Sequence, residues 1–306
     1  MRQWITVTIA FFTFSTLALA QSDSKAEHIM QQARAAICNE AQAKTLKTLS
    51  VAMTIHRTIG ETHLERDIDY DITLPDTFRR HESQQPFTTV TAMQEDSYQT
   101  YYVPNPAARA ADVLRENSND PHAITRRRAD FTRVLLGLLL ISPSSEPVEY
   151  TYAGEFKELD VLADMIDVTG KDGFKARLYL DRKTKTLLML TYQSKQLSHA
   201  VRALARQLSS QPKTVVPPDN KKLSEMQIAQ RQVAQWAEVE QRRKMFEEAL
   251  AQAPEVEYRW EFSDYKNIKG INFPYRVVKM EANHEYEEWD INAFRINPKL
   301  QAAKVK

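Results

Sequence analysis

The sequence predicts an α+β fold: a large, curled antiparallel sheet of about 11–12 strands whose concave face is plugged by helices. Three observations lead to this prediction. Runs of alternating apolar residues occupy two blocks of the chain, an unusually apolar helix separates the blocks, and another helix precedes the first block. Strands with one apolar face need a covering, and the two helices can supply it.

The C-terminal block has the clearest alternation. From Val256 to Phe262 every second residue is apolar and the residues between them are charged, so one face of a strand is strongly apolar. The runs 271–277 and 289–293 repeat this pattern after a turn at 267–270. Three such consecutive strands predict an antiparallel meander over a hydrophobic layer.

Shorter runs of the same kind predict the remaining strands. Gly, Pro and Asp residues predict turns between these strands, as at Pro75 and in the Gly170–Gly173 hairpin. The predicted strands are 49–55, 64–74, 77–82, 87–93 and 98–103 in the first block, and 148–156, 159–168, 174–180 and 187–192 in the second.

Two helices accompany these strands. An S-x-x-E capping box predicts a helix from Ser24 to the early forties. An Asp-Pro pair at 120–121 predicts the start of a second helix, which ends in the apolar run 134–141. Because this run is too short to cross a bilayer, we expect a helix end that is buried on nearly all sides. The three arginines at 126–128 either face solvent or meet an anionic group at the mouth of a cavity.

The first twenty residues are predicted to be a signal peptide. Arg2 supplies a positive charge, residues 4–19 are almost wholly apolar or hydroxylic, and Ala18 and Ala20 form a small-x-small cleavage site. The mature chain is therefore expected to start at Gln21 and to be soluble and exported.

The mature chain, 21–306, is predicted to be a single domain with a helical insertion at about 196–254. This stretch is rich in Gln, Ala, Arg, Lys and Glu, and it has helical spacing at 197–208 and 223–251 around the Pro217–Pro218 loop.

Composition excludes several classes of function. A net charge of +1 argues against a nucleic-acid binder, and six glycines leave little material for a glycine-rich phosphate loop. Cys38 is the single cysteine, so no intramolecular disulfide can form, and its apolar neighbours predict a buried small hydrophobe.

Enzyme signatures are missing from the sequence. The seven histidines have no metal-ligand spacing, and we expect no catalytic residue, no metal site and no cofactor. The carboxylates of Glu285–Glu288 are interpreted as a solvated strand edge. Asp164 and Asp167 lie among apolar strand residues, so they are the acids for which unusual burial is expected.

Four motifs carry a resemblance to a known family. A helix beginning Ala26-Glu-His-Ile-Met follows the predicted signal peptide, and a Lys171-Asp-Gly-Phe hairpin leads into Leu178-Tyr-Leu-Asp. The C-terminal part carries FSDYKNIKGINFPY at 262–275 and INAFRINP at 291–298. In these residues the chain resembles the LolA/LolB-like superfamily of periplasmic lipoprotein carriers and outer-membrane lipoprotein-sorting proteins, over most of the mature chain except roughly 196–254.

The resemblance implies an unclosed β-barrel in which helices form a lid over a cavity for acyl chains. It implies an acyl lipid or a lipoprotein as ligand and a membrane-bound donor or acceptor protein as partner, and we expect a monomer. The candidates for cavity lining and lid are Leu135, Leu138, Leu139, Leu178, Leu180, Tyr258, Trp260, Phe262, Phe273 and Trp289.

The sequence therefore predicts a non-enzymatic periplasmic carrier or binder of lipid or lipidated protein. The alternative is a periplasmic sensor or interaction module on the same fold, in which the insertion contacts a partner and no lipid is moved. An apolar inner face is compatible with a hollow barrel and with a solid core, and the bulk of Trp260 and Trp289 favours filling.

Overall fold

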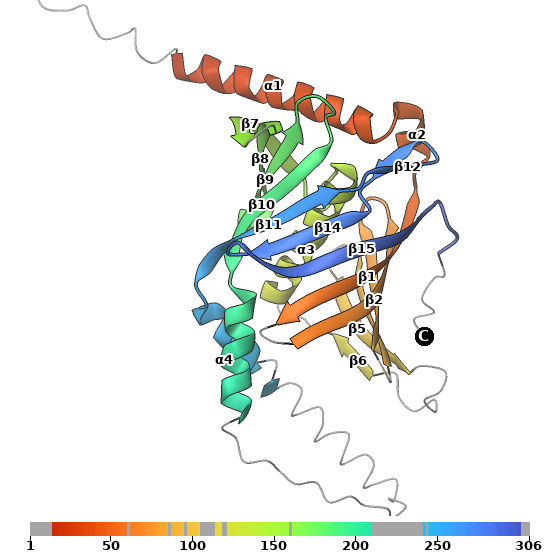
Figure 1. Ribbon diagram of the computed structural model, residues 1–306, viewed down its shortest axis with the longest axis vertical. Coiled ribbons are helices and arrows are strands. Elements are labelled where there is room, and N and C mark those ends of the chain that lie inside the picture. Colours follow the sequence, from red (N-terminus) through yellow and green to blue (C-terminus); the bar gives the residue numbers. More distant parts are fainter. Residues whose placement is uncertain are drawn as a thin grey trace, which may run out of the picture. The chain divides into compact units, whose positions relative to one another are not determined.

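The computed structural model describes residues 14–300, apart from 60–61, 85–86, 95–96, 105–113, 118–120, 159–160, 210–240 and 243. Most of its elements are labelled in Figure 1. In chain order they are α1 (Phe14–Ile37), α2 (Glu40–Thr45), β1 (Thr48–Ile59), β2 (Thr62–Thr73), β3 (Thr77–Gln84), β4 (Phe87–Gln94), β5 (Ser97–Pro104), β6 (Leu114–Asn117), α3 (Pro121–Leu139), β7 (Val148–Glu158), β8 (Val161–Gly170), the 3₁₀ turn Lys171–Gly173, β9 (Lys175–Asp181), β10 (Leu187–Lys195), α4 (Leu197–Ser209), β11 (Glu255–Ser263), β12 (Lys266–Ile268), β13 (Ile271–Phe273), β14 (Arg276–Glu281) and β15 (His284–Ile296).

Within the described residues, thirteen strands form one sheet in the order β6-β5-β4-β3-β2-β1-β15-β14-β11-β10-β9-β8-β7. The sheet is antiparallel, so the predicted large antiparallel sheet is confirmed, with slightly more strands than expected. The first and last strands of the fold, β1 and β15, pair with each other. They join the N-terminal block of strands to the C-terminal block.

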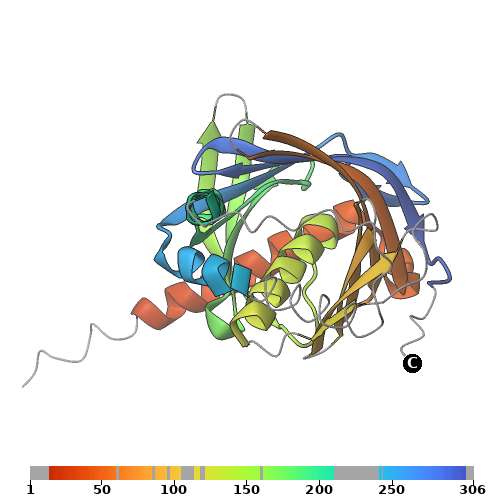
Figure 2. The ribbon, with the colours of Figure 1, turned by 90° about the horizontal axis from the view of Figure 1, so that it is seen from below.

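The sheet does not close, because its two edges, β6 and β7, are not paired with each other. The helix α3 lies between these two strands in the sequence. Figure 2 shows the strands curving around α3, which lies on their concave side. The predicted arrangement, a curled sheet plugged by a helix, is confirmed.

The N-terminal helix differs from the prediction. It begins at Phe14, so Ser24 lies inside α1 and does not cap it. It ends at Ile37, and Asn39 then caps the separate helix α2 by accepting a hydrogen bond from the Gln42 amide at 2.9 Å. The proposed cleavage site after Ala20 falls within α1, and residues 1–13 lie outside the described part of the chain.

The C-terminal meander also differs in one detail. The predicted run 271–277 is divided at Pro274, which has no amide hydrogen to donate to a ladder. Its first part, β13, pairs with β12 in a separate two-stranded sheet around the predicted turn, and β14 begins after Pro274 in the main sheet.

The chain divides into two compact units. The first comprises Met1–Tyr192 and Arg259–Lys306, and it holds most of the sheet together with α1 and α3. The second, Gln193–Tyr258, contains α4 and a further helical stretch at 244–252, and the predicted insertion falls within it. The predicted helix at 223–251 lies largely outside the described residues.

Candidate functional site

The C-terminal half of α3 forms the centre of the apolar interior. Every residue from Phe131 to Leu140 is buried, including the charged Arg133. The Phe131 ring lies 4.8 Å from the ring of Phe78 on β3. The expectation that the apolar helix end is buried on nearly all sides is thus correct.

Gly137 permits the closest approach of α3 to the sheet. A Cβ atom at this position would lie 2.7 Å from Cζ of Phe262 on β11, which is shorter than any normal carbon–carbon contact. The ring of Phe262 therefore packs against the bare backbone of the helix. This contact ties the position of α3 to an aromatic residue that the sequence had placed in the interior.

All ten residues predicted to line the cavity or its lid are buried, and nine belong to the hydrophobic core of the sheet and its helices. Tyr258 is the exception. Its hydroxyl donates a hydrogen bond to the Lys195 carbonyl at 3.0 Å and accepts one from the Leu197 amide at 2.8 Å. Tyr258 thus stabilises the start of α4, and its binding of lipid stays a prediction, as it does for the other nine.

The leucines of α3 lie in the apolar interior in this structure. Five leucines between 135 and 140 are each at most 6% exposed, and they pack among the inward-facing side chains of the strands. A ligand that took the place of α3 would have to displace these leucines.

Two polar contacts hold α3 in place. At its C-terminus, Arg34 of α1 donates a hydrogen bond from Nε to the Leu140 carbonyl at 2.9 Å. Nearer its N-terminus, Arg128 forms an ion pair of 3.1 Å with Glu146, and both side chains are largely buried. The loop that carries Glu146 is itself bound to the sheet, because the Ser145 amide donates to Asp76 at 3.2 Å.

The arginines at 126–128 were expected either to face solvent or to meet an anionic group at the mouth of a cavity, and neither alternative applies to all three. Arg128 is paired with Glu146, and the Arg127 guanidinium lies 5.7 Å from the ring centroid of Tyr98. The sequence could not reveal these partners, because both come from distant segments.

The concave side also contains charges, which we name the interior ion cluster: Arg57 on β1, Lys279 on β14 and Glu287 on β15. The Glu287 carboxylate is 4% exposed and accepts from Nε of Arg57 at 2.7 Å and from Nζ of Lys279 at 2.9 Å. It also accepts from the indole nitrogen of Trp289 at 2.6 Å.

Two indole rings enclose the ammonium group of this cluster. Nζ of Lys279 lies 3.9 Å from the ring centroid of Trp260 and 3.8 Å from that of Trp289. Such contacts stabilise a cation most when water is excluded. Two of the predicted lining residues therefore surround a charge as well as apolar groups.

Burial and charge act against each other in the cluster. Burial alone would raise the pKa of Glu287, but Lys279 and Arg57, with hydrogen bonds from Lys279 and Trp289, hold that pKa well below its usual range. Burial lowers the pKa of Lys279, and Glu287 opposes this effect. Glu287 is consequently ionised across the physiological range.

The interpretation of Glu285–Glu288 as a solvated edge is wrong for Glu287. Strand β15 lies between β1 and β14 and is not an edge, and Glu287 points inward with Trp289. The alternation itself contained this signal, because Glu287 and Trp289 are two residues apart, as are the inward Val277 and Lys279. The partnership with Arg57 contained none, because it joins residues 230 apart in the chain.

Helix α3 adds a further ion pair next to the cluster. Arg133 donates to Asp130 at 3.0 Å, and its guanidinium carbon lies 3.7 Å from the ring centroid of Tyr192. The Asp130 side chain is 47% exposed whereas that of Arg133 is 10% exposed, so Asp130 is the member of this ion pair that reaches solvent. The negative charge of Asp130 also favours the protonated form of Lys279, which increases its pKa against the effect of burial.

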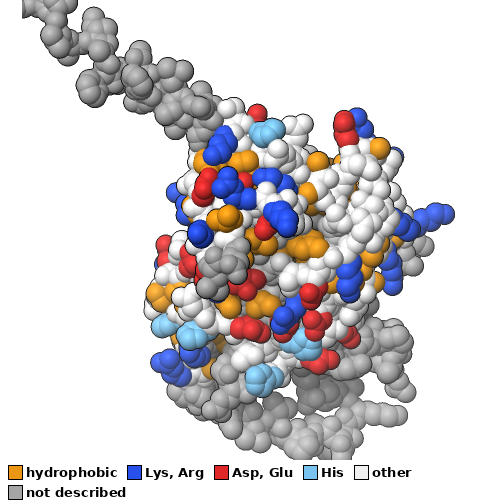
Figure 3. Space-filling view, turned by 45° about the horizontal axis from the view of Figure 1, so that its top comes forward, with side chains coloured by type: hydrophobic (Ala, Val, Ile, Leu, Met, Phe, Trp, Pro, Cys, Tyr) orange, Lys and Arg blue, Asp and Glu red, His pale blue; other side chains and the backbone are white. Residues whose placement is uncertain are grey.

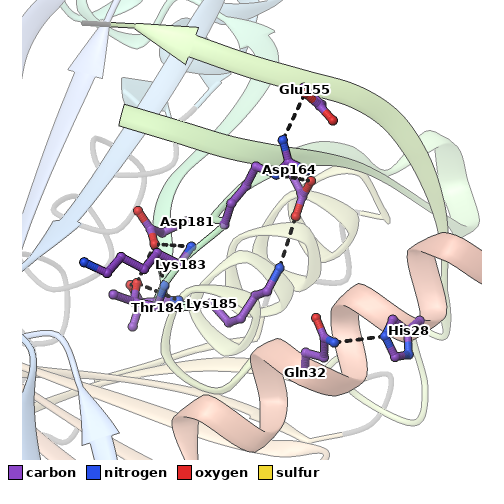
Figure 4. Close-up of polar contacts among 10 residues, drawn as sticks. His28, Gln32, Glu155, Asp164, Asp181, Lys183, Thr184 and Lys185 are labelled. Atoms are coloured by element: carbon purple, nitrogen blue, oxygen red, sulfur yellow. Dashed lines mark hydrogen bonds and ion pairs between the residues drawn. The ribbon is translucent and has the colours of Figure 1, made fainter. Parts of the chain in front are cut away.

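Of the two acids predicted to have unusual burial, one does. Asp164 is 4% exposed and pairs with Lys185 at 3.3 Å and with Arg182 at 3.5 Å (Figure 4). Asp167 is about 40% exposed and forms a hydrogen-bonded pair with Arg177 at 2.6 Å. Both acids have cationic partners on neighbouring turns or strands, and this arrangement stabilises the sheet.

A separate surface pocket of about 420 Å³ lies beside β12, the start of β14 and the middle of β15. It is mostly polar, with lining residues Asp264, Tyr265, Lys266, Tyr275, Arg276, Asp290 and Ile291. On the face shown in Figure 3, acidic and basic side chains of the described residues are interspersed. This agrees with the small net charge of the chain.

Among the described residues, no group of three or more His, Cys, Asp or Glu side chains is placed to hold a metal ion. The helices of the described part include none that is both long and apolar enough to cross a membrane.

No family model matches the sequence, and no curated protein matches it. Solved structures do resemble it. A LolA superfamily protein from Nitrosomonas europaea is 10% identical, with a TM-score of 0.48 over 89% of this chain and 94% of that one. A putative outer membrane lipoprotein-sorting protein domain from Vibrio parahaemolyticus is 9% identical, with a TM-score of 0.49 over 91% and 95%. A DUF1329 family protein from Desulfovibrio piger is 11% identical, with a TM-score of 0.42 over 90% and 95%.

Proposed function

We propose that this protein is an exported, non-enzymatic carrier or binder of lipid or lipidated protein that acts in the periplasm, in lipoprotein sorting or lipid transport. The observation that carries the proposal is the position of α3. It is a helix with a fully buried apolar end, it lies on the concave side of a sheet that does not close, and it connects the two unpaired edges of that sheet.

The exchange of α3 for an acyl chain replaces one set of apolar contacts by another. The five leucines at 135–140 carry about twenty aliphatic side-chain carbons, which is comparable to one sixteen-carbon chain. Each methylene of the ligand that leaves water contributes about 0.8 kcal/mol. A chain burying ten methylenes therefore contributes about 8 kcal/mol, enough to offset the opening of a helix held by few polar contacts.

A cross-linking experiment tests whether α3 must move. In a Cys38→Ser background, Arg128→Cys with Glu146→Cys places two thiols where an ion pair now joins α3 to a loop bound to the sheet. A short bis-maleimide should then fix the helix, and uptake of a fluorescent fatty acid should fall at least tenfold.

The matched control restrains nothing outside the helix. Arg128→Cys with Thr132→Cys joins two residues one turn apart, where the Thr132 hydroxyl already donates to the Arg128 carbonyl at 2.9 Å. This variant should take up the fatty acid normally after cross-linking. Equal uptake by both cross-linked variants would exclude the proposed movement.

The second candidate function is a periplasmic interaction module, and the compact unit Gln193–Tyr258 favours it. Its helix α4 contains Arg202 and Arg206 and no acidic residue. Native mass spectrometry after gentle purification distinguishes the two functions. A co-purified acyl ligand supports the carrier, whereas a ligand-free chain bound to a stable protein partner supports the module.

A further inference from the structure

We propose that the interior ion cluster binds the anionic head of the acyl ligand, a carboxylate or a phosphate, once α3 with its Asp130 has been displaced. This inference rests on the proposed carrier function and specifies the chemistry of its ligand.

The first argument is that apolar side chains could occupy the place of the cluster. Buried ion pairs lose so much hydration that apolar side chains of similar volume often stabilise a core equally well. Lys279, Glu287 and Arg57 nevertheless lie on three neighbouring strands, in a region otherwise filled by apolar and aromatic side chains. Ionisable groups placed in this way are more common at binding sites than in ordinary cores.

The second argument is the balance of charge on the strands. Besides the cluster, Glu82 on β3 pairs with Arg80 at 2.8 Å and lies 3.9 Å from Arg66 on β2. Glu281, which is 5% exposed, lies two residues beyond Lys279. Among the seven charged residues named here, four are cationic and three are carboxylates, so this group by itself carries one positive charge. These residues are Arg57, Arg66, Arg80 and Lys279, with Glu82, Glu281 and Glu287.

The third argument is an unused donor beside the cluster. The indole nitrogen of Trp260 on β11 is buried and has no hydrogen-bond partner among the described residues. An indole nitrogen can donate and cannot accept. An anionic oxygen would satisfy it, whereas an additional cation or a neutral donor would not.

The fourth argument is the order of groups along α3. Its carboxylate, Asp130, precedes the buried leucines at 135–140. With a rise of 1.5 Å per residue, Asp130 and Leu140 are separated by about 15 Å along the axis. The helix thus presents a carboxylate followed by aliphatic carbons, which is the pattern of a fatty acid or of a lipid phosphate. When α3 leaves, Asp130 and Arg133 leave together, and the interior ion cluster, with two cations and one carboxylate, is available to the ligand.

The test compares three ligands with the same sixteen-carbon chain by equilibrium dialysis: hexadecanoate, hexadecyl phosphate and hexadecanol. The unmodified chain should bind at least one anionic ligand ten or more times more tightly than hexadecanol. Lys279→Met should remove about tenfold of that anionic affinity and change hexadecanol binding less than twofold.

The matched control is Lys266→Met. The Lys266 ammonium also lies on an aromatic ring, 3.9 Å from the centroid of Tyr275, but the residue is exposed and lies on β12, away from the cluster. This variant should bind all three ligands like the unmodified chain.

A second variant keeps the test decisive if Lys279→Met does not fold. Asp130 is half-exposed, so Asp130→Asn should fold, and loss of the competing carboxylate should strengthen hexadecanoate binding several-fold. Asp167→Asn, which changes an equally exposed and arginine-paired aspartate on β8, should not.

The outcomes separate this inference from the proposed function. Equal affinity for hexadecanol and both anionic ligands, or unchanged anionic affinity in Asp130→Asn, would overturn the anionic site and leave the carrier intact. Failure to bind any of the three ligands would overturn the carrier function as well.

Discussion

Truncation of one leucine of α3 should weaken the fold and strengthen ligand binding. Leu138 is 2% exposed, and replacing such a leucine with alanine costs about 3 kcal/mol because contacts are lost and a cavity remains. If the ligand-bound form has α3 displaced, Leu138→Ala destabilises the ligand-free form and leaves the bound form nearly unchanged. A difference of about 3 kcal/mol then raises affinity by up to about a hundredfold.

The assay is a pair of measurements on each variant: the free energy of unfolding in urea and the dissociation constant of hexadecanoate by equilibrium dialysis. Leu178→Ala is the control, because Leu178 is 0% exposed but belongs to strand β9 of the sheet. It should lose similar stability without gaining affinity. Lower stability together with unchanged or weaker binding in Leu138→Ala would refute the displacement of α3.

Three other predictions concern single positions. Gly137→Ala places a methyl group against Phe262, so it should lower the free energy of unfolding by about 1–2 kcal/mol despite the better helix propensity of alanine. Phe262→Leu in the same chain should restore the lost stability. An unchanged free energy of unfolding in Gly137→Ala alone would contradict the close packing. The lowered pKa of Glu287 means that the folded state binds fewer protons than the unfolded state in acid, so the contribution of ionised Glu287 to the free energy of unfolding is present above about pH 4.3 and is lost as pH falls. In Glu287→Gln the free energy of unfolding, measured in urea from pH 3 to 7, should therefore fall less steeply as the pH is lowered. An unchanged dependence on pH would contradict the ionisation of Glu287. Tyr258→Phe should speed amide hydrogen exchange at the start of α4, because two backbone groups lose their partner, and unchanged exchange would show that the hydroxyl is dispensable.

Much of the fold follows from local patterns in the sequence. The alternation at Val256–Phe262 predicts β11, and the apolar run at 134–141 predicts a helix end without solvent contact, because both depend on which residues must leave water. Ser24 was misleading for the opposite reason. A capping box is a local preference, and the α1 helix begins ten residues earlier regardless of it.

The candidate site could be predicted only in part. Side chains alternate between the two faces of a strand, and this alternation places Trp260 and Trp289 on the inner face of the sheet. The same alternation places Lys279 and Glu287 on that face. The cluster forms, however, because β1 pairs with β15, and this pairing joins strands from opposite ends of the chain. Strand order of this kind is set by long-range packing, which no local motif encodes.

The most direct test of the central claim is amide hydrogen exchange at residues 131–140, with and without saturating hexadecanoate. These amides belong to a helix that is buried in the ligand-free chain. We predict that protection of α3 falls when the ligand binds, while protection of β9 is maintained. Undiminished protection of α3 in the presence of bound ligand would contradict the account, because the ligand would then lie elsewhere.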